Sequence, residues 1–147
     1  MTSSRLNIRR ALTWLWHWLP PLIVMATIFY ASAQTSLPQA KGEWLDALIK
    51  KLAHIGEYTV LFLLLARAWA YSVRLPSSLW AAWLSTAAYA ISDEVHQSFV
   101  PNRHANWYDV VIDVALPLLL SVLYGFASRR GGSSQHLRHG EHQDLPK

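Results

Sequence analysis

Most of the side chains that could do chemistry lie in residues 92–113, SDEVHQSFVPNRHANWYDVVID. This stretch combines four carboxylates with two histidines, a glutamine and an arginine, and apolar runs precede and follow it. If those runs cross a membrane, the polar groups lie where two helices meet the membrane surface. An ionisable group costs on the order of 2.5–3.5 kcal/mol at the centre of a membrane helix and less near its ends, so such groups are usually paired and functional. The pattern therefore predicts a polar site at a membrane boundary.

A second polar group, His54, Glu57 and Tyr58, shares one side of a predicted helix in the apolar stretch 52–71, because a helix turns by about 100° per residue. Most basic residues lie near the chain ends or after this stretch, which predicts that both termini are cytoplasmic. In that orientation, three predicted spans bring their polar ends to the same outer face. The residues expected to form one ligand-binding site there are His54, Glu57, Tyr58, Asp93, Glu94, His96, Gln97, Arg103, Asp109 and Asp113.

The charges of this cluster leave two main interpretations open. Because Arg103 is the one permanent cation of the hairpin, at least one carboxyl should be protonated or hydrogen-bonded, or a cationic ligand group should enter. In one interpretation the cluster is purely structural, and Arg103 ties its turn to nearby acids. In the other, Arg103 holds the phosphate of an amphiphile, which is either bound or processed. The candidates for proton transfer are His54, Glu57 and His96.

Other kinds of site have weaker support. His54, His96, Asp93 and Asp109 have the right types for a divalent metal, but no compact motif such as HExxH accompanies them, so we expect no metal and no cofactor. A nucleophile elbow for serine catalysis is absent from the sequence. Whether the protein is an enzyme stays open.

The elements that must position these residues are predicted to be helices of a polytopic, all-α membrane protein. Apolar residues make up 52% of the chain, and the 15% that are charged cluster at the ends and in short connections, as is typical of membrane spans. A short amphipathic helix lying in the interface is predicted within 32–51, before the second span. The four predicted transmembrane helices cover residues 12–31, 52–71, 79–91 and 110–127.

These spans define a membrane domain, 12–127, between a cytoplasmic N-terminus, 1–11, and a tail, 128–147, whose Gly, Ser and His content predicts disorder. A cleaved signal peptide is the alternative for the first apolar run, but the run is long and Pro20 and Pro21 interrupt it. The net charge of +4 comes from residues that flank the spans, so we expect no nucleic-acid partner. The sequence has no cysteine, which excludes disulfides and thiolate chemistry.

Two stretches resemble the VanZ-like family of small bacterial membrane proteins. Residues 51–69, KLAHIGEYTVLFLLLARAW, are similar to its pattern of histidine, then Glu-Tyr, then an apolar run closed by Arg-Ala. Residues 92–113 are similar to its Asp-Glu-x-His-Gln, then Phe-Val-Pro-x-Arg, then two acidic or amide positions four apart. Residues 29–38 are similar to its first outer loop. The sequence departs from the family at Asn102 and Leu116, where glycine is usual.

The resemblance implies the same ten polar residues and a place in the cytoplasmic (inner) membrane of a bacterium. The family is named after a protein linked to low-level resistance to teicoplanin, so it implies a cell-envelope role and, by analogy, an effect on glycopeptide susceptibility. We expect the outer-face site to bind a lipid-linked or cell-wall-related ligand from the surrounding bilayer. The alternatives are a membrane-embedded enzyme acting on a phosphorylated lipid and a purely structural polar network. The sequence leaves the oligomeric state open.

Overall fold

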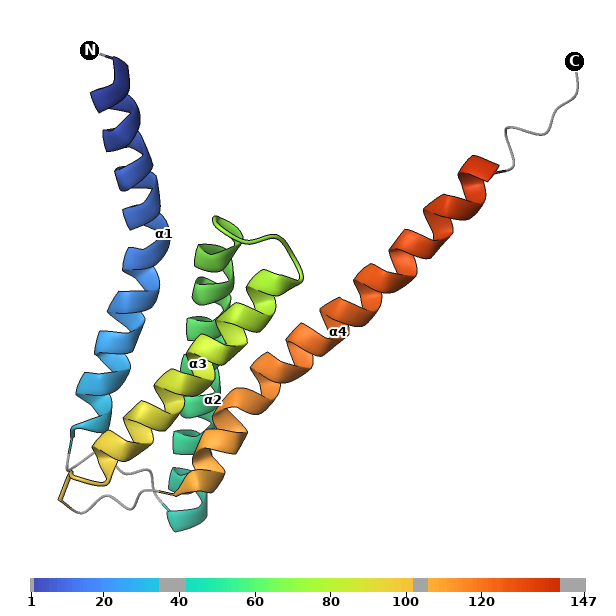
Figure 1. Ribbon diagram of the computed structural model, residues 1–147. Coiled ribbons are helices and arrows are strands. Elements are labelled where there is room, and N and C mark those ends of the chain that lie inside the picture. Colours follow the sequence, from blue (N-terminus) through green and yellow to red (C-terminus); the bar gives the residue numbers. More distant parts are fainter. Residues whose placement is uncertain (1, 35–41, 102–105, 141–147) are drawn as a thin grey trace, which may run out of the picture.

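The computed structural model describes residues 2–34, 42–101 and 106–140 of the chain. These residues form four α-helices and no strand, which confirms the all-α prediction. The helices run alternately up and down, so the end of each lies near the start of the next (Figure 1). They are α1 (Thr2–Ser32), α2 (Glu43–Ala70), α3 (Ser77–Gln97) and α4 (Trp107–Gly140).

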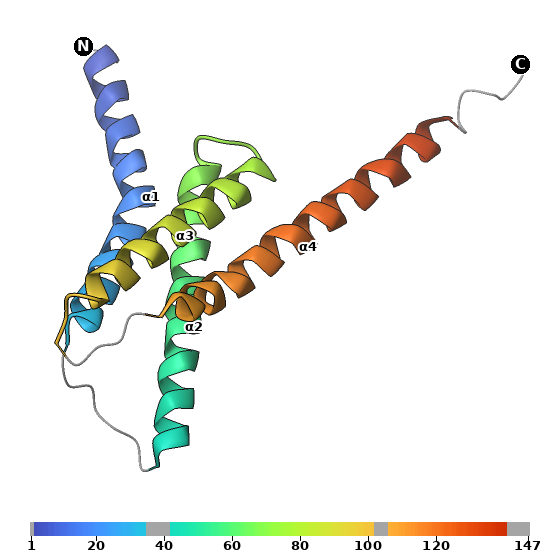
Figure 2. The same cartoon turned by 60° about the horizontal axis from the view of Figure 1, so that its bottom comes forward.

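The core of the bundle is centred on α2, which packs against each of the other three helices. Its buried side chains include Tyr58, Leu61, Phe62 and Leu65, and Ile28 of α1 joins them. The C-terminal part of α4 points away from the other helices, as both ribbon views show (Figures 1 and 2). The contacts of α4 with α2 and α3 therefore come from its earlier part.

A single stripe of small and polar residues lets α3 lie against this core. Its buried residues are spaced by three or four positions, which places them on one face of the helix. Small side chains on that face allow close helix approach. Along the helix the stripe changes from small to polar, and its members are Ser78, Ala82, Thr86, Ala90, Asp93 and Gln97.

Two of the four helices are long and apolar enough to cross a membrane. Their candidate spans are Asn7–Ser32 in α1 and Trp107–Ser128 in α4. Sequence reasoning predicted four spans, so composition supports half of them. The reason is that His54, Glu57 and Arg67 lie inside the apolar part of α2, and α3 ends with acids, a histidine and a glutamine. These residues lower the hydropathy of both helices.

The predicted interfacial helix before the second span is not a separate element. It is the first part of α2, which continues without a break from Glu43 to Ala70. No proline interrupts this segment, and Gly56 is accommodated within the helix. At the other end of the chain, α4 continues to Gly140 and so covers much of segment 128–147, for which composition predicted disorder. The domain boundaries themselves stay predictions.

Candidate functional site

The carboxylate of Asp93 is the centre of a buried network that joins three helices. Its Oδ1 accepts a hydrogen bond of 2.6 Å from the Ser32 hydroxyl of α1. Its Oδ2 accepts one of 3.1 Å from the Tyr58 hydroxyl of α2 and one of 2.9 Å from Nε2 of Gln97, one turn further along α3. All four side chains are buried. Asp93 thus has the hydrogen-bond partners that a buried polar group requires, and they hold three helices together.

A second set of contacts joins α2 to α4. Lys51 Nζ lies 3.2 Å from Asp109 Oδ1, and both side chains are partly exposed. One turn deeper, Nδ1 of His54 lies 3.7 Å from Oδ2 of the buried Asp113. The two acids are four residues apart on α4 and their partners are three apart on α2, so both pairs form along facing sides of the helices.

The start of α4 is attached to the end of α3. The side-chain oxygen of Asn106 accepts a hydrogen bond of 3.2 Å from the Tyr108 N–H, in the manner of a helix N-cap. The backbone carbonyl of Asn106 also accepts one of 2.8 Å from the Asp109 N–H. Glu94 of α3 in turn accepts a hydrogen bond from the backbone N–H of Asn106. Glu94 therefore helps to place the first turn of α4, and with it Asp109.

These contacts surround a pocket of about 240 Å³ at this end of the bundle. We call it the polar pocket, and it opens where α2, α3 and α4 meet. Side chains of both charges line it, so it can receive a ligand that is itself charged or rich in hydrogen-bonding groups. Its lining residues are Ala47, Lys50, Lys51, His54, Glu94, Gln97, Asp109 and Asp113.

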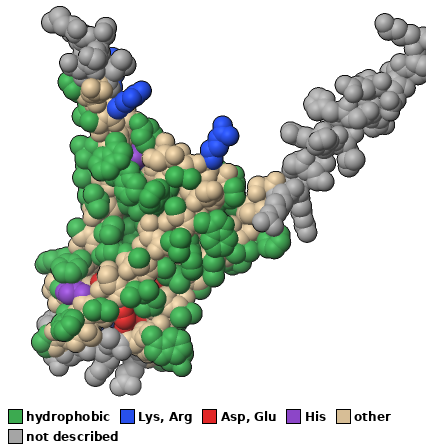
Figure 3. All heavy atoms as spheres, in the orientation of Figure 1, with side chains coloured by type: hydrophobic (Ala, Val, Ile, Leu, Met, Phe, Trp, Pro, Cys, Tyr) green, Lys and Arg blue, Asp and Glu red, His purple; other side chains and the backbone are tan. Residues whose placement is uncertain are grey.

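Charge is distributed unevenly over the molecule. In the space-filling view, acidic side chains are visible near the end where α3 finishes, whereas Lys and Arg side chains are visible near the opposite end (Figure 3). At that opposite end, Nη2 of Arg67 donates a hydrogen bond of 2.8 Å to the backbone carbonyl of Trp16. The sequence predicted the clustering of polar groups from three helices, but not the contact between Arg67 and α1.

The structure separates the ten predicted site residues into groups. Five of them line the polar pocket: His54, Glu94, Gln97, Asp109 and Asp113. Asp93 and Tyr58 lie in the buried network behind it. His96 stacks on Phe29 of α1 with ring centroids 4.1 Å apart, and Glu57 lies in the space between α1 and α2. Arg103 is outside the described residues.

Other residues of the site were missed by the sequence reasoning. Ser32 ends the first helix and gave no polar pattern of its own, because its partner is distant in sequence. Lys51 could have been found, since it precedes His54 by three residues and therefore lies on the same face of the helix. It was not among the ten predicted site residues.

The proposed metal ligands do not come together. In the described part of the chain, no three histidine or carboxylate side chains are grouped so that they could hold one metal ion. His54 faces Asp113, whereas His96 lies against Phe29. The donor arrangement therefore gives the metal interpretation no support.

Comparison with known proteins adds a family to this geometry. The model of the VanZ/LLP1 family matches residues 9–128. The chain belongs to the VanZ/LLP1 family. The match begins within α1 and ends within α4, so all the residues that line the polar pocket of this VanZ-like protein lie inside it. No curated protein and no solved structure matches the chain significantly. The family and the two apolar helices together indicate a membrane protein of the cell envelope.

Proposed function

We propose that this VanZ-like protein binds the polar head of a lipid-linked or cell-wall-related ligand in the polar pocket. The observation that carries the proposal is the pocket itself, which places charged groups of both signs at one end of a bundle of membrane helices. In the proposed topology all four helices cross the bacterial inner membrane, both termini are cytoplasmic, and the pocket faces outward.

Helix length is compatible with four spans. At about 1.5 Å per residue, the 28 residues of α2 extend about 42 Å and the 21 residues of α3 about 32 Å. A bilayer core is about 30 Å thick. Either helix can therefore cross it while its polar end reaches the interface, where ionisable groups cost less than at the membrane centre.

The chemistry of the pocket favours a head group with both an anionic part and hydrogen-bond donors. Lys50 and Lys51 can attract a phosphate, although each already has an acidic neighbour, Asp46 and Asp109 respectively. The pocket also contains Glu94, Asp109 and Asp113, which would accept hydrogen bonds from amine or hydroxyl groups of the ligand. A phosphorylated head that carries amines or sugar hydroxyls fits this donor and acceptor set better than a phosphate alone.

The test is mass spectrometry of lipids retained by protein purified in mild detergent. Lys51→Gln removes one cation from the pocket, and Arg74→Gln removes one exposed cation from the opposite end as a matched control. A specific phosphorylated lipid should be retained by wild type and by Arg74→Gln and lost from well-folded Lys51→Gln. Identical lipids in all three proteins would reject head-group binding in this pocket.

The topology is tested separately with thiol labelling, which is simplified because the natural chain has no cysteine. Ser72 and Ser98 lie on either side of α3, and both are exposed. A membrane-impermeant thiol reagent should label Ser98→Cys in intact cells and Ser72→Cys only after permeabilisation. Labelling of both positions from one side would show that α3 does not cross the membrane, and the reverse pattern would invert the orientation.

One observation favours a second function, an enzyme that acts on a phosphorylated lipid. His54 lies in the pocket beside the buried carboxylate of Asp113, which can hold an imidazole in one orientation for proton transfer. In this case His54→Gln would retain the lipid but stop its conversion. If His54→Gln and wild type leave the same lipid chemically unchanged during incubation, the binding function alone stands.

The family also suggests a biological consequence. We propose that binding of an envelope ligand changes susceptibility to glycopeptide antibiotics, by analogy with the protein after which the family is named. The measurement is the inhibitory concentration of teicoplanin for a susceptible bacterium that expresses wild type or Lys51→Gln at equal levels. Equal inhibitory concentrations with and without the wild-type protein would reject this consequence.

A further inference from the structure

The polar pocket and a groove between α1 and α2 both adjoin one cavity that lies between them. The polar pocket shares Lys50 and His54 with a second cavity of about 210 Å³. That cavity shares Ile28, Ala53 and Glu57 with a third, of about 430 Å³. Because neighbouring cavities share wall residues, they adjoin one another in a row along α2, from the end of the bundle toward its middle, and we call this row the path.

The walls of this path change from polar to apolar along its length. The third cavity, which we call the α1–α2 groove, is lined mainly by Val24, Ile28, Ala53 and Val60. Thr27 also lines it, but its hydroxyl donates to the Ile23 carbonyl of its own helix at 2.9 Å. Glu57 is the ionisable residue among those lining the groove, at the junction with the second cavity. The path is therefore charged at one end and apolar at the other.

We infer that the α1–α2 groove holds one hydrocarbon chain of a phosphorylated lipid whose head lies in the polar pocket. This inference rests on the proposed function and assigns the rest of the ligand. The occupant follows from the adjacency of the cavities and from the change in their polarity, which matches an amphiphile. One wall of the groove is α1, a candidate membrane span that is mostly uncovered by the rest of the protein, so a lipid can enter sideways from the bilayer.

Gly56 provides a way to fill the groove without disturbing the fold. It lines the groove, and a Cβ atom placed on it would meet no atom within 4 Å. Leucine is also a better helix former than glycine in a helix interior. Gly56→Leu should therefore fold, while its side chain occupies space that a lipid chain would use.

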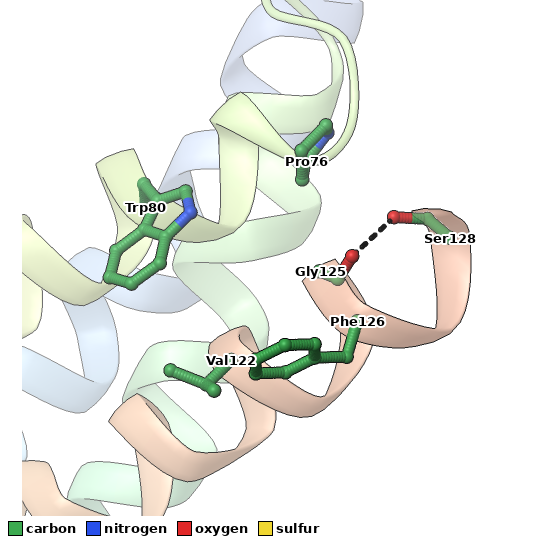
Figure 4. A pocket seen from close by; sticks show the side chains of 6 residues that line it. All are labelled: Pro76, Trp80, Val122, Gly125, Phe126 and Ser128. Carbon is green, nitrogen blue, oxygen red and sulfur yellow. Dashed lines mark hydrogen bonds between the residues drawn. The ribbon is translucent and has the colours of Figure 1, made fainter. Parts of the chain in front are cut away.

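Gly125 offers a matched control at the other end of the bundle. A Cβ atom there would also meet nothing within 4 Å. Gly125 lines a separate cavity of about 380 Å³ between the start of α3 and the later part of α4, together with Trp80 and Phe126 (Figure 4). Gly125→Leu thus adds the same side chain to a helix interior but leaves the α1–α2 groove open.

The experiment must report where the hydrocarbon chain of the lipid lies. The bilayer is as apolar as the groove, so filling the groove would change the affinity for the lipid little. Full-length protein is placed in phosphatidylcholine vesicles containing phosphatidylethanolamine with a photoreactive diazirine in its acyl chain. Adducts are mapped by mass spectrometry of peptides. A diacylglycerol with the same photoreactive chain serves as the probe without a charged head.

In wild type and Gly125→Leu, phosphatidylethanolamine adducts should be in excess at Val24 and Val60 over Leu22 and Ile23, which are 52% and 56% exposed. Gly56→Leu should lose this excess. Equal labelling of both sets in wild type, or an excess that survives in Gly56→Leu, overturns the inference about the groove.

The head-group proposal fails in a different way. Lys51→Gln should reduce the excess for phosphatidylethanolamine to the level of diacylglycerol. If the two probes already label the groove equally in wild type, the groove holds a chain but the polar pocket does not select its head. If Lys51 determines which lipid is retained while no probe labels the groove, the head-group proposal stands and the chain lies elsewhere.

Discussion

Replacing Asp93 with alanine should destabilise the protein far more than replacing it with asparagine. Asp93→Ala removes the acceptor of three hydrogen bonds, from Ser32, Tyr58 and Gln97. Asp93→Asn keeps one acceptor oxygen, which can still accept hydrogen bonds from Tyr58 and Gln97. Its amide can donate to the Ser32 hydroxyl, which then donates to the Phe29 carbonyl, 3.1 Å away. The network can therefore survive the loss of the charge.

The magnitude of the alanine effect follows from what each donor loses. A buried donor without an acceptor costs about 1–3 kcal/mol, and Tyr58, which is 1% exposed, should be near the upper part of this range. Gln97 lines the polar pocket and can be hydrated, and Ser32 retains the Phe29 carbonyl, so these two should contribute less. We expect a loss of about 2–4 kcal/mol for Asp93→Ala, and less than about 1 kcal/mol for Asp93→Asn.

The assay is reversible unfolding in mild detergent by titration with dodecyl sulfate, followed by circular dichroism. Adding Tyr58→Phe to Asp93→Ala should recover part of the loss, because it removes the donor left without an acceptor. Equal destabilisation by alanine and asparagine would refute the reasoning, since it would make the negative charge, rather than the hydrogen bonds, the stabilising feature. An undisturbed Asp93→Ala protein would show that the network does not hold the helices.

Three other changes have distinct expected outcomes. Lys51→Gln should lower the free energy of unfolding by at most about 1 kcal/mol, because its ion pair is partly exposed; a larger loss would mark it as a structural residue. Pro20 has no N–H to donate to the Trp16 carbonyl, which accepts a hydrogen bond from Arg67 instead. Arg67→Met should therefore lower the free energy of unfolding by about 1–3 kcal/mol. The loss should be clearly smaller in the Pro20→Ala background, where residue 20 again donates to this carbonyl. Equal costs in the two backgrounds would contradict this. Asn106→Ala should lower the free energy of unfolding by about 0.5–2 kcal/mol, because the N-cap hydrogen bond is lost. Asn106→Ser should retain most of this stability, and the same titration measures both variants.

The helices were predictable because hydrophobic periodicity is a local property. Sequence reasoning placed four helices and their up-and-down order, but it broke α2 at residue 52, where the surface pattern changes from amphipathic to apolar. The backbone has no reason to break there, because neither a proline nor a glycine turn interrupts the segment. A change in the surroundings of a helix is therefore a poor guide to where the helix ends.

The site was predictable as a region, while its pairings were not. Residues of like polarity on three helices predicted that Tyr58, His54 and the acids of α3 and α4 would meet. Which acid faces which donor depends on the rotation of each helix about its axis, and that is set by packing over the whole interface. Sequence spacing could therefore not assign Tyr58 to Asp93 and His54 to Asp113. Ser32 was missed for the same reason, since its partner is 61 residues away.

The structural and ligand-binding interpretations of the acidic cluster are compatible, because the buried network forms part of the cavity walls. Gln97 donates to Asp93 and also lines the polar pocket. Ser32 donates to the same carboxylate and lines the second cavity on the path to the α1–α2 groove. A network that fixes the walls of a site limits the reorganisation needed when a ligand binds. Asp93→Ala should therefore weaken both folding and lipid retention, whereas Lys51→Gln should weaken retention with little effect on folding. This difference separates the residues that support the site from those that contact its ligand.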